Sequence, residues 1–247
     1  MLTCGSWIGS ERRGKVNILA IGAHPDDIEI LCGGTLAIYA RAGHKVTMLT
    51  VANGDMGSTT LPPAQIAAIR RKESEASAAI IGAKFVCLDV PDVKVIPDLE
   101  TRRKLTVEIR RARPDVILAH SPDDYMHDHR NASILALDAS FDATIANIKT
   151  DADPMPFVPI YFMDTIGGIG FEPAEYVDIS DHFHTKRRML ACHESQVAWI
   201  AAHDQADLLQ TMEIMSRFRG LQAGVAFAEA FRPYAAWGRL RPRRLLP

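Results

Sequence analysis

The chain has 247 residues, of which 47% are hydrophobic and 23% are charged. These values are ordinary for a soluble globular protein, and the length suits one α/β domain with a substantial core. The formal net charge of −2 gives no reason to expect a nucleic acid or another polyanion as partner.

Neither a targeting nor a membrane-spanning segment is predicted. Residues 1–15 lack the continuous apolar stretch of a signal peptide, and no segment approaches the roughly 20 apolar residues that cross a bilayer. The four cysteines are scattered without CxxC spacing, as is typical of reduced thiols in the cytosol. We therefore expect a cytoplasmic protein without membrane insertion. The basic C-terminal residues are expected to form a solvated end: Arg239, Arg241, Arg243 and Arg244.

The first predicted strand is the apolar run at residues 16–23, whose length is typical of a strand buried on both faces. It ends in the sequence HPDD at 24–27, where open α/β sheets place their ligands. His24 and Asp27 are three residues apart across a proline turn, so both could reach one cation. Alternatively, the aspartates of this turn only cap the helix that follows.

Strands and helices then alternate along the chain, which predicts a mostly parallel sheet with helices on both faces. We expect a Rossmann-like three-layer αβα fold and a single domain over 1–247, with its core at about 16–232. No G-x-G-x-x-G follows the first strand, which argues against nucleotide binding. Further strands are predicted at 45–55, 84–90, 115–120, 159–165 and 175–180, and helices at 36–43, 63–82, 99–113, 131–148 and over most of 182–232.

A second polar cluster, at residues 120–130, follows the fourth predicted strand. If the first and fourth strands are neighbours, His24, Asp27 and a histidine from 127–129 converge. Two imidazoles and one carboxylate match a catalytic zinc site with a position open for water. Asp26 would then be free to accept a proton from that water. A structural zinc site would more often use cysteines, and none is suitably placed.

The motifs of both clusters resemble those of one family. AHPDDIE followed by GGTLA resembles the first motif of the LmbE-like/PIG-L family of zinc-dependent N-deacetylases. The second family motif, typically D-Y-H-P-D-H-R, is similar to DYMHDHR at 124–130. The resemblance covers about 16–232. Further matches are TVANGDMG, Arg70-x-x-Glu73, HESQ at 193–196 and AEAFR at 228–232.

The resemblance implies one Zn²⁺ per chain on His24, Asp27 and His129, with Asp26 as the general base. It implies a hydrolase that uses zinc-activated water to remove an N-acetyl or other N-acyl group from a linear amide. The substrate class it implies is a small N-acylated amino sugar of the N-acetylglucosamine type, or its conjugate. It also implies a homo-oligomer, because related enzymes often form one.

The second motif departs from the family pattern at one position. Asp128 would normally orient the first histidine of this motif, but Met126 stands there, and a thioether can neither donate a proton nor carry charge. His127, at the usual proline position, is the nearest substitute as the catalytic imidazole. Other candidates lie in the later segment: His182, His184 and His193.

Arg70 and Tyr125 are the candidate substrate-binding residues. Arg70 resembles a family arginine, and a guanidinium suits sugar hydroxyls or an anionic aglycone; alternatively, it forms an ion pair on a helix surface. Tyr125 either lines the mouth of the site or packs in the interior. Two alternatives to this deacetylase remain, a hydrolase of another amide and a non-catalytic metal-binding member of the family. Asp26 argues against the latter, because a mere binding site needs no base.

Overall fold

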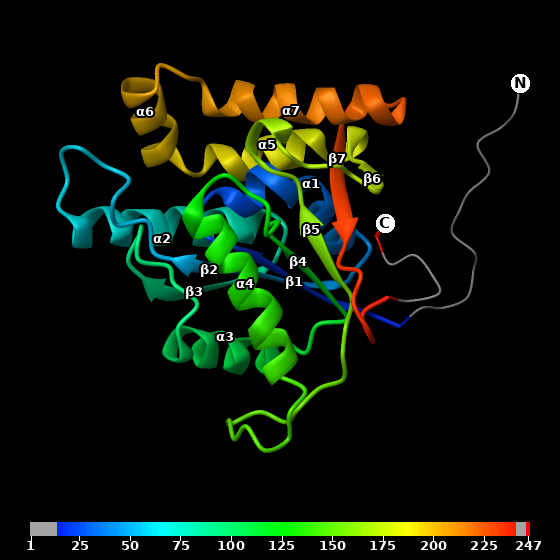
Figure 1. The fold of residues 1–247 in the computed structure, drawn as a ribbon. Helices are drawn as coiled ribbons and strands as arrows, with labels where there is room; N and C mark the ends of the chain where they lie inside the picture. The colour runs from blue at the N-terminus through cyan, green and yellow to red at the C-terminus, as the bar shows by residue number, and fades with distance from the viewer. Residues whose placement is uncertain (1–13, 241–245) are drawn as a thin grey trace, which may run out of the picture.

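One seven-stranded sheet forms the middle of the structure (Figure 1), a computed structural model that describes residues 14–240 and 246–247. The strand order is β3-β2-β1-β4-β5-β7-β6, and the first five of these strands are parallel. β7 runs antiparallel to both β5 and β6, so the predicted mostly parallel sheet is confirmed. The strands are β1 (Asn17–Gly22), β2 (Lys45–Ala52), β3 (Lys84–Val90), β4 (Val116–Ala119), β5 (Ile160–Met163), β6 (Glu175–Asp178) and β7 (Ala228–Pro233).

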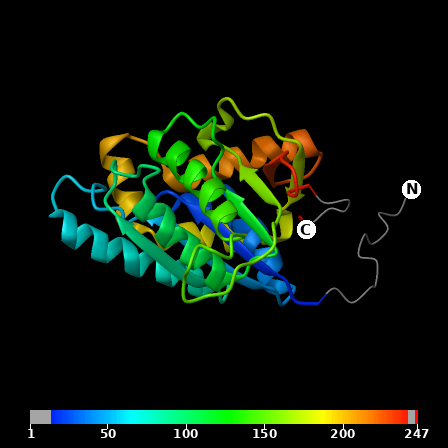
Figure 2. The same ribbon diagram turned by 60° about the horizontal axis from the view of Figure 1, so that its bottom comes forward.

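Helices cover both faces of this sheet, which completes the predicted three layers (Figures 1 and 2). On one face lie α1 (Asp27–Arg41), α2 (Pro63–Ile80), α5 (Phe183–Ala191), α6 (Glu194–His203) and α7 (Leu208–Ala223). On the other lie α3 (Leu99–Ala112) and α4 (His127–Asp142). In the described part of the chain, no helix is long and apolar enough to cross a membrane.

β1 is buried between two separate hydrophobic cores. Ile18 and Ala20 belong to the core beneath α1 and α5, whereas Leu19 and Ile21 belong to the core beneath α3 and α4. Successive side chains of a strand point to opposite faces, so a strand covered on both sides needs an apolar residue at every position. This explains the uninterrupted apolar run that predicted the strand.

The order of the strands reverses at β1, because the chain moves to β2 and β3 on one side and to β4 and β5 on the other. Ile21 pairs with Ala119, so β1 and β4 end side by side. A crevice forms at such a reversal, outside the carboxyl ends of the strands. His24 and His120 follow these two ends, and the expected neighbourhood of the first and fourth strands is therefore confirmed.

Gly33 and Gly34 lie within α1 and allow this helix to pack closely against its neighbours. The N–H groups of Gly34 and Thr35 donate to the two carboxylate oxygens of Glu229 at 2.8 and 2.7 Å, and Lys186 Nζ lies 2.7 Å from the same carboxylate. A Cβ on Gly34 would lie 2.8 Å from Ile179, so only glycine allows α1 to pack this closely. The pair is thus committed to protein contacts.

β7 is a correction to the predicted elements. Residues 228–232 were expected in a mostly helical segment because alanine and glutamate favour helices. They instead pair with β5 on one side and with β6 on the other, and Ala228, Glu229 and Ala230 are all buried. The hydrogen bonds of two neighbouring strands outweigh the local preference.

The basic C-terminal end differs from its prediction at Arg239, which is only 4% exposed. Its guanidinium donates to the Val158 carbonyl at 3.1 Å and to Ser140 Oγ at 2.9 Å, so it is not solvated. Residues 241, 243 and 244, together with Cys4, lie outside the described residues. The other cysteines, Cys32, Cys87 and Cys192, are free thiols.

Candidate metal centre and active site

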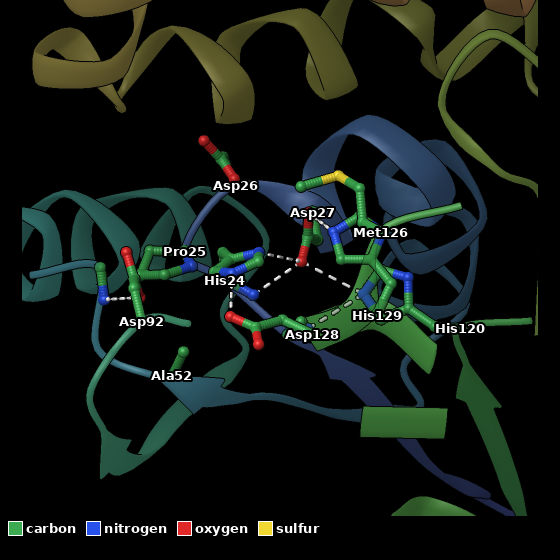
Figure 3. A network of polar contacts seen from close by, with 12 residues as sticks. His24, Pro25, Asp26, Asp27, Ala52, Asp92, His120, Met126, Asp128 and His129 are labelled. Atoms are coloured by element: carbon green, nitrogen blue, oxygen red, sulfur yellow. Dashed lines mark hydrogen bonds and ion pairs between the residues drawn. The ribbon is translucent and has the colours of Figure 1, made fainter. Parts of the chain in front are cut away.

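Three side chains from three elements meet at the crevice between β1 and β4 (Figure 3). His24 follows β1, Asp27 is the first residue of α1, and His129 lies in the first turn of α4. Their potential ligand atoms all lie within 4.8 Å of one another. α4 begins at His127 and not at the predicted 131, so the last four residues of the second motif form its first turn. The structure therefore brings together the three residues that the sequence singled out.

Each of the two histidines is held by its own carboxylate. His24 Nε2 lies 3.1 Å from Asp128 Oδ2, and His129 Nδ1 lies 3.0 Å from Asp124 Oδ2. Such contacts orient an imidazole and leave its second nitrogen available to a metal ion. Here the available atoms are His24 Nδ1 and His129 Nε2. Asp128 thus orients His24, whereas the family motif would have it orient an imidazole at position 126.

Asp27 completes the group. Its Oδ1 lies 3.2 Å from His129 Nε2, while its Oδ2 accepts the His24 N–H at 2.6 Å and lies 3.1 Å from His120 Nε2. Burial opposes ionisation, but the neighbouring His129 and His120 outweigh it and hold the pKa of Asp27 well below its usual range. The carboxylate is therefore charged and has one oxygen directed at the histidine ligand atoms.

The electrostatics of this group favour a cation. Burial lowers the pKa of His24, but Asp128 and Asp27 outweigh it and raise the pKa to about 10. Burial likewise opposes the charge on His129, yet Asp27 and Asp124 raise its pKa to about 9. The carboxylates thus stabilise positive charge at both imidazoles, and a metal ion would experience the same attraction.

A second group of His120, Asp124 and His129 also has the spacing of a metal site. However, the rings of His120 and His129 are stacked, with centroids 4.0 Å apart and an interplanar angle of 23°. The lone pairs of imidazole nitrogens lie in the ring plane, so those of nearly parallel rings do not converge on one ion. Asp124 is already engaged with His129 Nδ1. We therefore regard His120 and Asp124 as supports of the first group.

Asp26 lies beside the three-residue group and has an unusual backbone conformation. Its φ of 116° falls in the left-handed region, which residues other than glycine rarely adopt and which often marks a functional site. The residue is 8% exposed. Burial raises the pKa of its carboxyl to about 6, against the lowering effect of Arg70. A carboxylate that titrates near neutrality is suited to act as a general base.

Arg70, the predicted substrate-binding arginine, is only 4% exposed. It donates to the carbonyls of Pro25 at 2.6 Å and Gly54 at 3.3 Å, and to Asp26 Oδ2 at 3.3 Å. A Cβ on Gly54, whose φ is 80°, would lie 2.6 Å from the Arg70 side chain. The guanidinium is therefore enclosed by protein groups and supports the turn that carries Asp26.

The residues around position 126, where the family motif has a histidine, differ in exposure. Met126 is half-buried, and its side chain lies over Asp27 in Figure 3. The His127 side chain is 56% exposed and directs its Nε2 to Asp128 Oδ1 at 2.9 Å. Tyr125 is 51% exposed at the same turn, so it does not pack in the interior.

The three histidines of the later segment lie at different places in the structure. His182 shares a surface hollow with Ala40 and Arg41 at the far end of α1, roughly 20 Å along this helix from Asp27. His184 is exposed on α5. His193 is fully buried before α6, with Nε2 3.0 Å from Glu29 in the first turn of α1. Burial lowers the pKa of His193, but Glu29 and Asp26 outweigh it and raise the pKa.

The loop after β3 contributes contacts that the sequence did not suggest. The Asp92 carboxylate accepts the N–H groups of Gly54 at 2.8 Å and Met56 at 3.3 Å and lies 3.7 Å from Arg70. The next N–H, that of Val93, donates to Asp128 at 2.8 Å. The sequence signal for these contacts is an aspartate two residues after the end of β3.

Two family motifs of unassigned role join into one support. The N–H and Oγ of Ser195 donate to Glu73 at 2.7 and 2.6 Å. Gln196 Nε2 donates to the Gly57 carbonyl at 3.1 Å, and an added Cβ on Gly57 would contact both Gln196 and Arg70. The start of α6 is thereby fixed to α2 and to the loop around Arg70.

The fold and this site define a class of three-layer αβα proteins with a His/Asp centre at the strand reversal. The PIG-L family, described as GlcNAc-PI de-N-acetylase, matches residues 19–140. A diacetylchitobiose deacetylase of Thermococcus kodakarensis is 30% identical over 228 residues, 87% of this chain and 82% of that protein. The chain therefore belongs to the LmbE-like/PIG-L family, as the motifs indicated.

Two further comparisons show the range of this similarity. The structure of an N,N'-diacetylchitobiose deacetylase from Pyrococcus horikoshii has a TM-score of 0.77 and 29% identity, covering 88% of this chain and 83% of the other. A 4-oxalmesaconate hydratase of Pseudomonas putida is 27% identical over 188 residues, 72% of this chain and 73% of that protein. The chain thus resembles both deacetylases and a hydratase.

Proposed function

We propose that this protein is a zinc-dependent N-deacetylase acting on a small N-acylated amino sugar or its conjugate. The observation that carries the proposal is the convergence of two imidazoles and a carboxylate beside a second, separately held carboxylate. The diacetylchitobiose deacetylase relatives support the same substrate class.

The residues present fit one divalent cation held by His24, Asp27 and His129. The fit rests on His129 Nε2, which is buried without a hydrogen-bond partner and faces Asp27 Oδ1. Three nitrogen and oxygen ligands are typical of catalytic zinc centres, which keep a position open for water or substrate. When bound, zinc would supply a Lewis acid that polarises the acyl oxygen and lowers the pKa of water.

Asp26 is the proposed general base. It accepts a proton from the water that attacks the acyl carbon, and it returns the proton to the amine when the C–N bond breaks. Arg70 holds it in place and, in this proposal, does not contact the substrate. His127 is the proposed substitute for the imidazole absent at Met126, because it is exposed at the site and held by Asp128. Tyr125 is the proposed contact of the sugar.

Location and assembly are part of the same proposal. The free thiols Cys32, Cys87 and Cys192 support a cytoplasmic location. A homo-oligomer is supported by α7, whose exposed face carries large apolar side chains at helical spacing. They are Ile214, Phe218 and Leu221. Sedimentation analysis of the purified chain tests this point.

A second candidate function, suggested by the hydratase relative, is hydration of an unsaturated polycarboxylate. The charges near the site argue against it. Carboxylates of Asp26, Asp92, Asp124 and Asp128 lie around the centre, while Arg70 is enclosed by protein groups. A polyanionic substrate would be repelled there, whereas a neutral N-acyl sugar would not.

Acetate release from a panel of N-acetylated sugars tests the proposal. The purified chain is assayed after chelation and after addition of Zn²⁺. We expect release only with the metal and its loss in Asp26→Asn. Hydration of an unsaturated polycarboxylate without acetate release from any sugar would contradict the proposal and support the second candidate.

A further inference from the structure

Three residues with apolar side-chain surface adjoin the carboxylates that support the candidate centre and leave much of this surface exposed. We call Val93, Tyr125 and Met126 the apolar rim. Val93 is 60% and Tyr125 51% exposed, and Met126 is half-buried. They come from two segments, the loop after β3 and the turn before α4, that are far apart in the sequence.

Hydrogen bonds to the carboxylates of the centre fix the backbone of this rim. The Val93 N–H donates to Asp128, which holds His24. The Met126 N–H donates at 2.9 Å to Asp124, which holds His129. The rim and the two histidines therefore share their supports, so the rim has a definite position beside the centre.

Val93 also carries backbone strain. Its φ of 59° lies in the left-handed region, where a β-branched side chain is a genuine outlier. Glycine or asparagine would satisfy this backbone with less strain and would still offer the N–H to Asp128. An exposed isopropyl group at such a position is not explained by packing or by backbone geometry. A contact with a ligand would explain it.

Met126 extends the apolar surface to the centre itself. Its side chain lies over Asp27 (Figure 3), at the position where the family motif has an imidazole. A thioether is flexible and polarizable, and it favours contact with apolar and aromatic groups. A substrate that presented only hydroxyl groups here would bury them without a hydrogen-bond partner.

We propose that the substrate carries an apolar group next to the scissile amide and that the apolar rim binds this group. The inference rests on the proposed deacetylase function and narrows its substrate class to N-acyl amino sugars with an apolar aglycone or a longer acyl chain. Both sources present the same hydrocarbon surface to the rim. Val93 and Met126 are then specificity-determining residues.

Equilibrium binding tests the inference without depending on turnover. Calorimetry gives Kd of the Asp26→Asn chain with Zn²⁺ for methyl N-acetylglucosaminide and for two matched ligands. One replaces the methyl aglycone with phenyl, and the other replaces acetyl with hexanoyl. We expect at least one of these two to bind roughly tenfold more tightly than the methyl N-acetyl compound. The ligand that binds more tightly shows whether the aglycone or the acyl chain supplies the apolar group.

Rim variants provide the decisive comparison. Val93→Asn suits the left-handed backbone and Met126→Gln keeps the side-chain length, so both remove apolar surface with little change of shape. Each should reduce the tenfold preference several-fold. Leu99→Gln, a change at a 63% exposed residue at the start of α3, is the matched control and should retain the preference.

Two outcomes would overturn the inference. Equal Kd values for all three ligands would remove its basis, and so would a preference that survives both rim variants. A change of sedimenting mass in the rim variants, with an unchanged preference, would assign the rim to contacts between copies of the chain. Acetate release by the unmodified chain is measured separately. A preference without acetate release from any ligand would therefore contradict only the proposed function.

Discussion

The adjacent carboxylates of Asp26 and Asp27 show how strongly surroundings differentiate identical residues. Asp27 contacts three imidazoles and keeps its charge, whereas Asp26 is buried beside one guanidinium and has a pKa raised to about 6. The strained backbone at Asp26 turns the two side chains apart. The proposed division into metal ligand and base follows from this difference.

Asp26→Asn should retain zinc and lose about 10²- to 10⁴-fold in kcat, because an amide cannot accept the proton of the attacking water. Asp27→Asn should instead lose the metal, since three ligands leave little redundancy. Elemental analysis and initial rates of both variants test this. Equal loss of zinc from the two variants would contradict the assignment.

The carboxylates behind the histidines should tune the metal affinity. Asp124→Ala should weaken zinc binding about 10- to 100-fold, because His129 loses the partner that orients it. Asp123→Ala is the matched control, since that neighbour is exposed and pairs with Arg232. Competition with a chromophoric chelator measures both affinities. An unchanged affinity in Asp124→Ala would contradict this supporting role and would also argue against the stacked group, of which Asp124 is a member.

At the scale of elements, short segments with unremarkable sequences position the helices that form the site. β7 supplies Glu229, which binds the middle of α1 and the buried Lys186 of α5. The start of α6 brings His193 Nε2 to 3.0 Å from Glu29, and Asp26 also raises the pKa of this imidazole. These contacts hold the first turn of α1 in place, and with it Asp27.

Glu229→Gln should destabilise the fold by about 3–5 kcal/mol, because it leaves the Lys186 charge buried without a counter-charge. Glu229→Gln combined with Lys186→Met should recover part of this loss, since the remaining group is then neutral. Urea unfolding of the two variants and the unmodified chain measures the difference. A double variant as unstable as the single one would show that the N–H bonds of α1 dominate.

His127→Ala and His193→Ala distinguish the two remaining imidazoles. His127→Ala should keep zinc and stability and lower kcat by about 10²-fold, as expected for loss of a hydrogen-bond donor to the tetrahedral oxyanion. His193→Ala should lower the unfolding free energy by about 1–3 kcal/mol or more, because Glu29 loses a buried partner. Rates, zinc content and urea unfolding are measured together. Near-normal turnover of His127→Ala would contradict its proposed role.

For the whole molecule, the proposed metal centre joins β1, α1 and α4 at the reversal of one sheet, which supports a single domain. Zinc at a concentration 100-fold above Kd should stabilise the folded chain by about 2.7 kcal/mol, because the unfolded chain lacks the assembled ligands. Thermal unfolding with and without chelator tests this. His129→Ala should show little of the shift, and a full shift in that variant would point to another site.

Several features of this protein could be predicted from local sequence, because each depends on neighbouring residues. The apolar run of β1 reflects burial on both faces, and the polar clusters mark the strand ends. The resemblance of the two motifs predicts that His24, Asp27 and His129 form one metal site. β7 could not be predicted, because its pairing with β5 and β6 depends on long-range partners that no local preference encodes.

Other features were decided only by the tertiary structure. Arg70 could equally have been a surface residue, and only the packing of α2 against the turns at Pro25 and Gly54 encloses it. Asp128 orients His24, about a hundred residues away, because β1 and β4 end side by side. The sequence by itself determined the chemical groups of the centre and the strand ends that they follow. Their distances and protonation depend on the strand order and on burial, which exist only once the chain has folded.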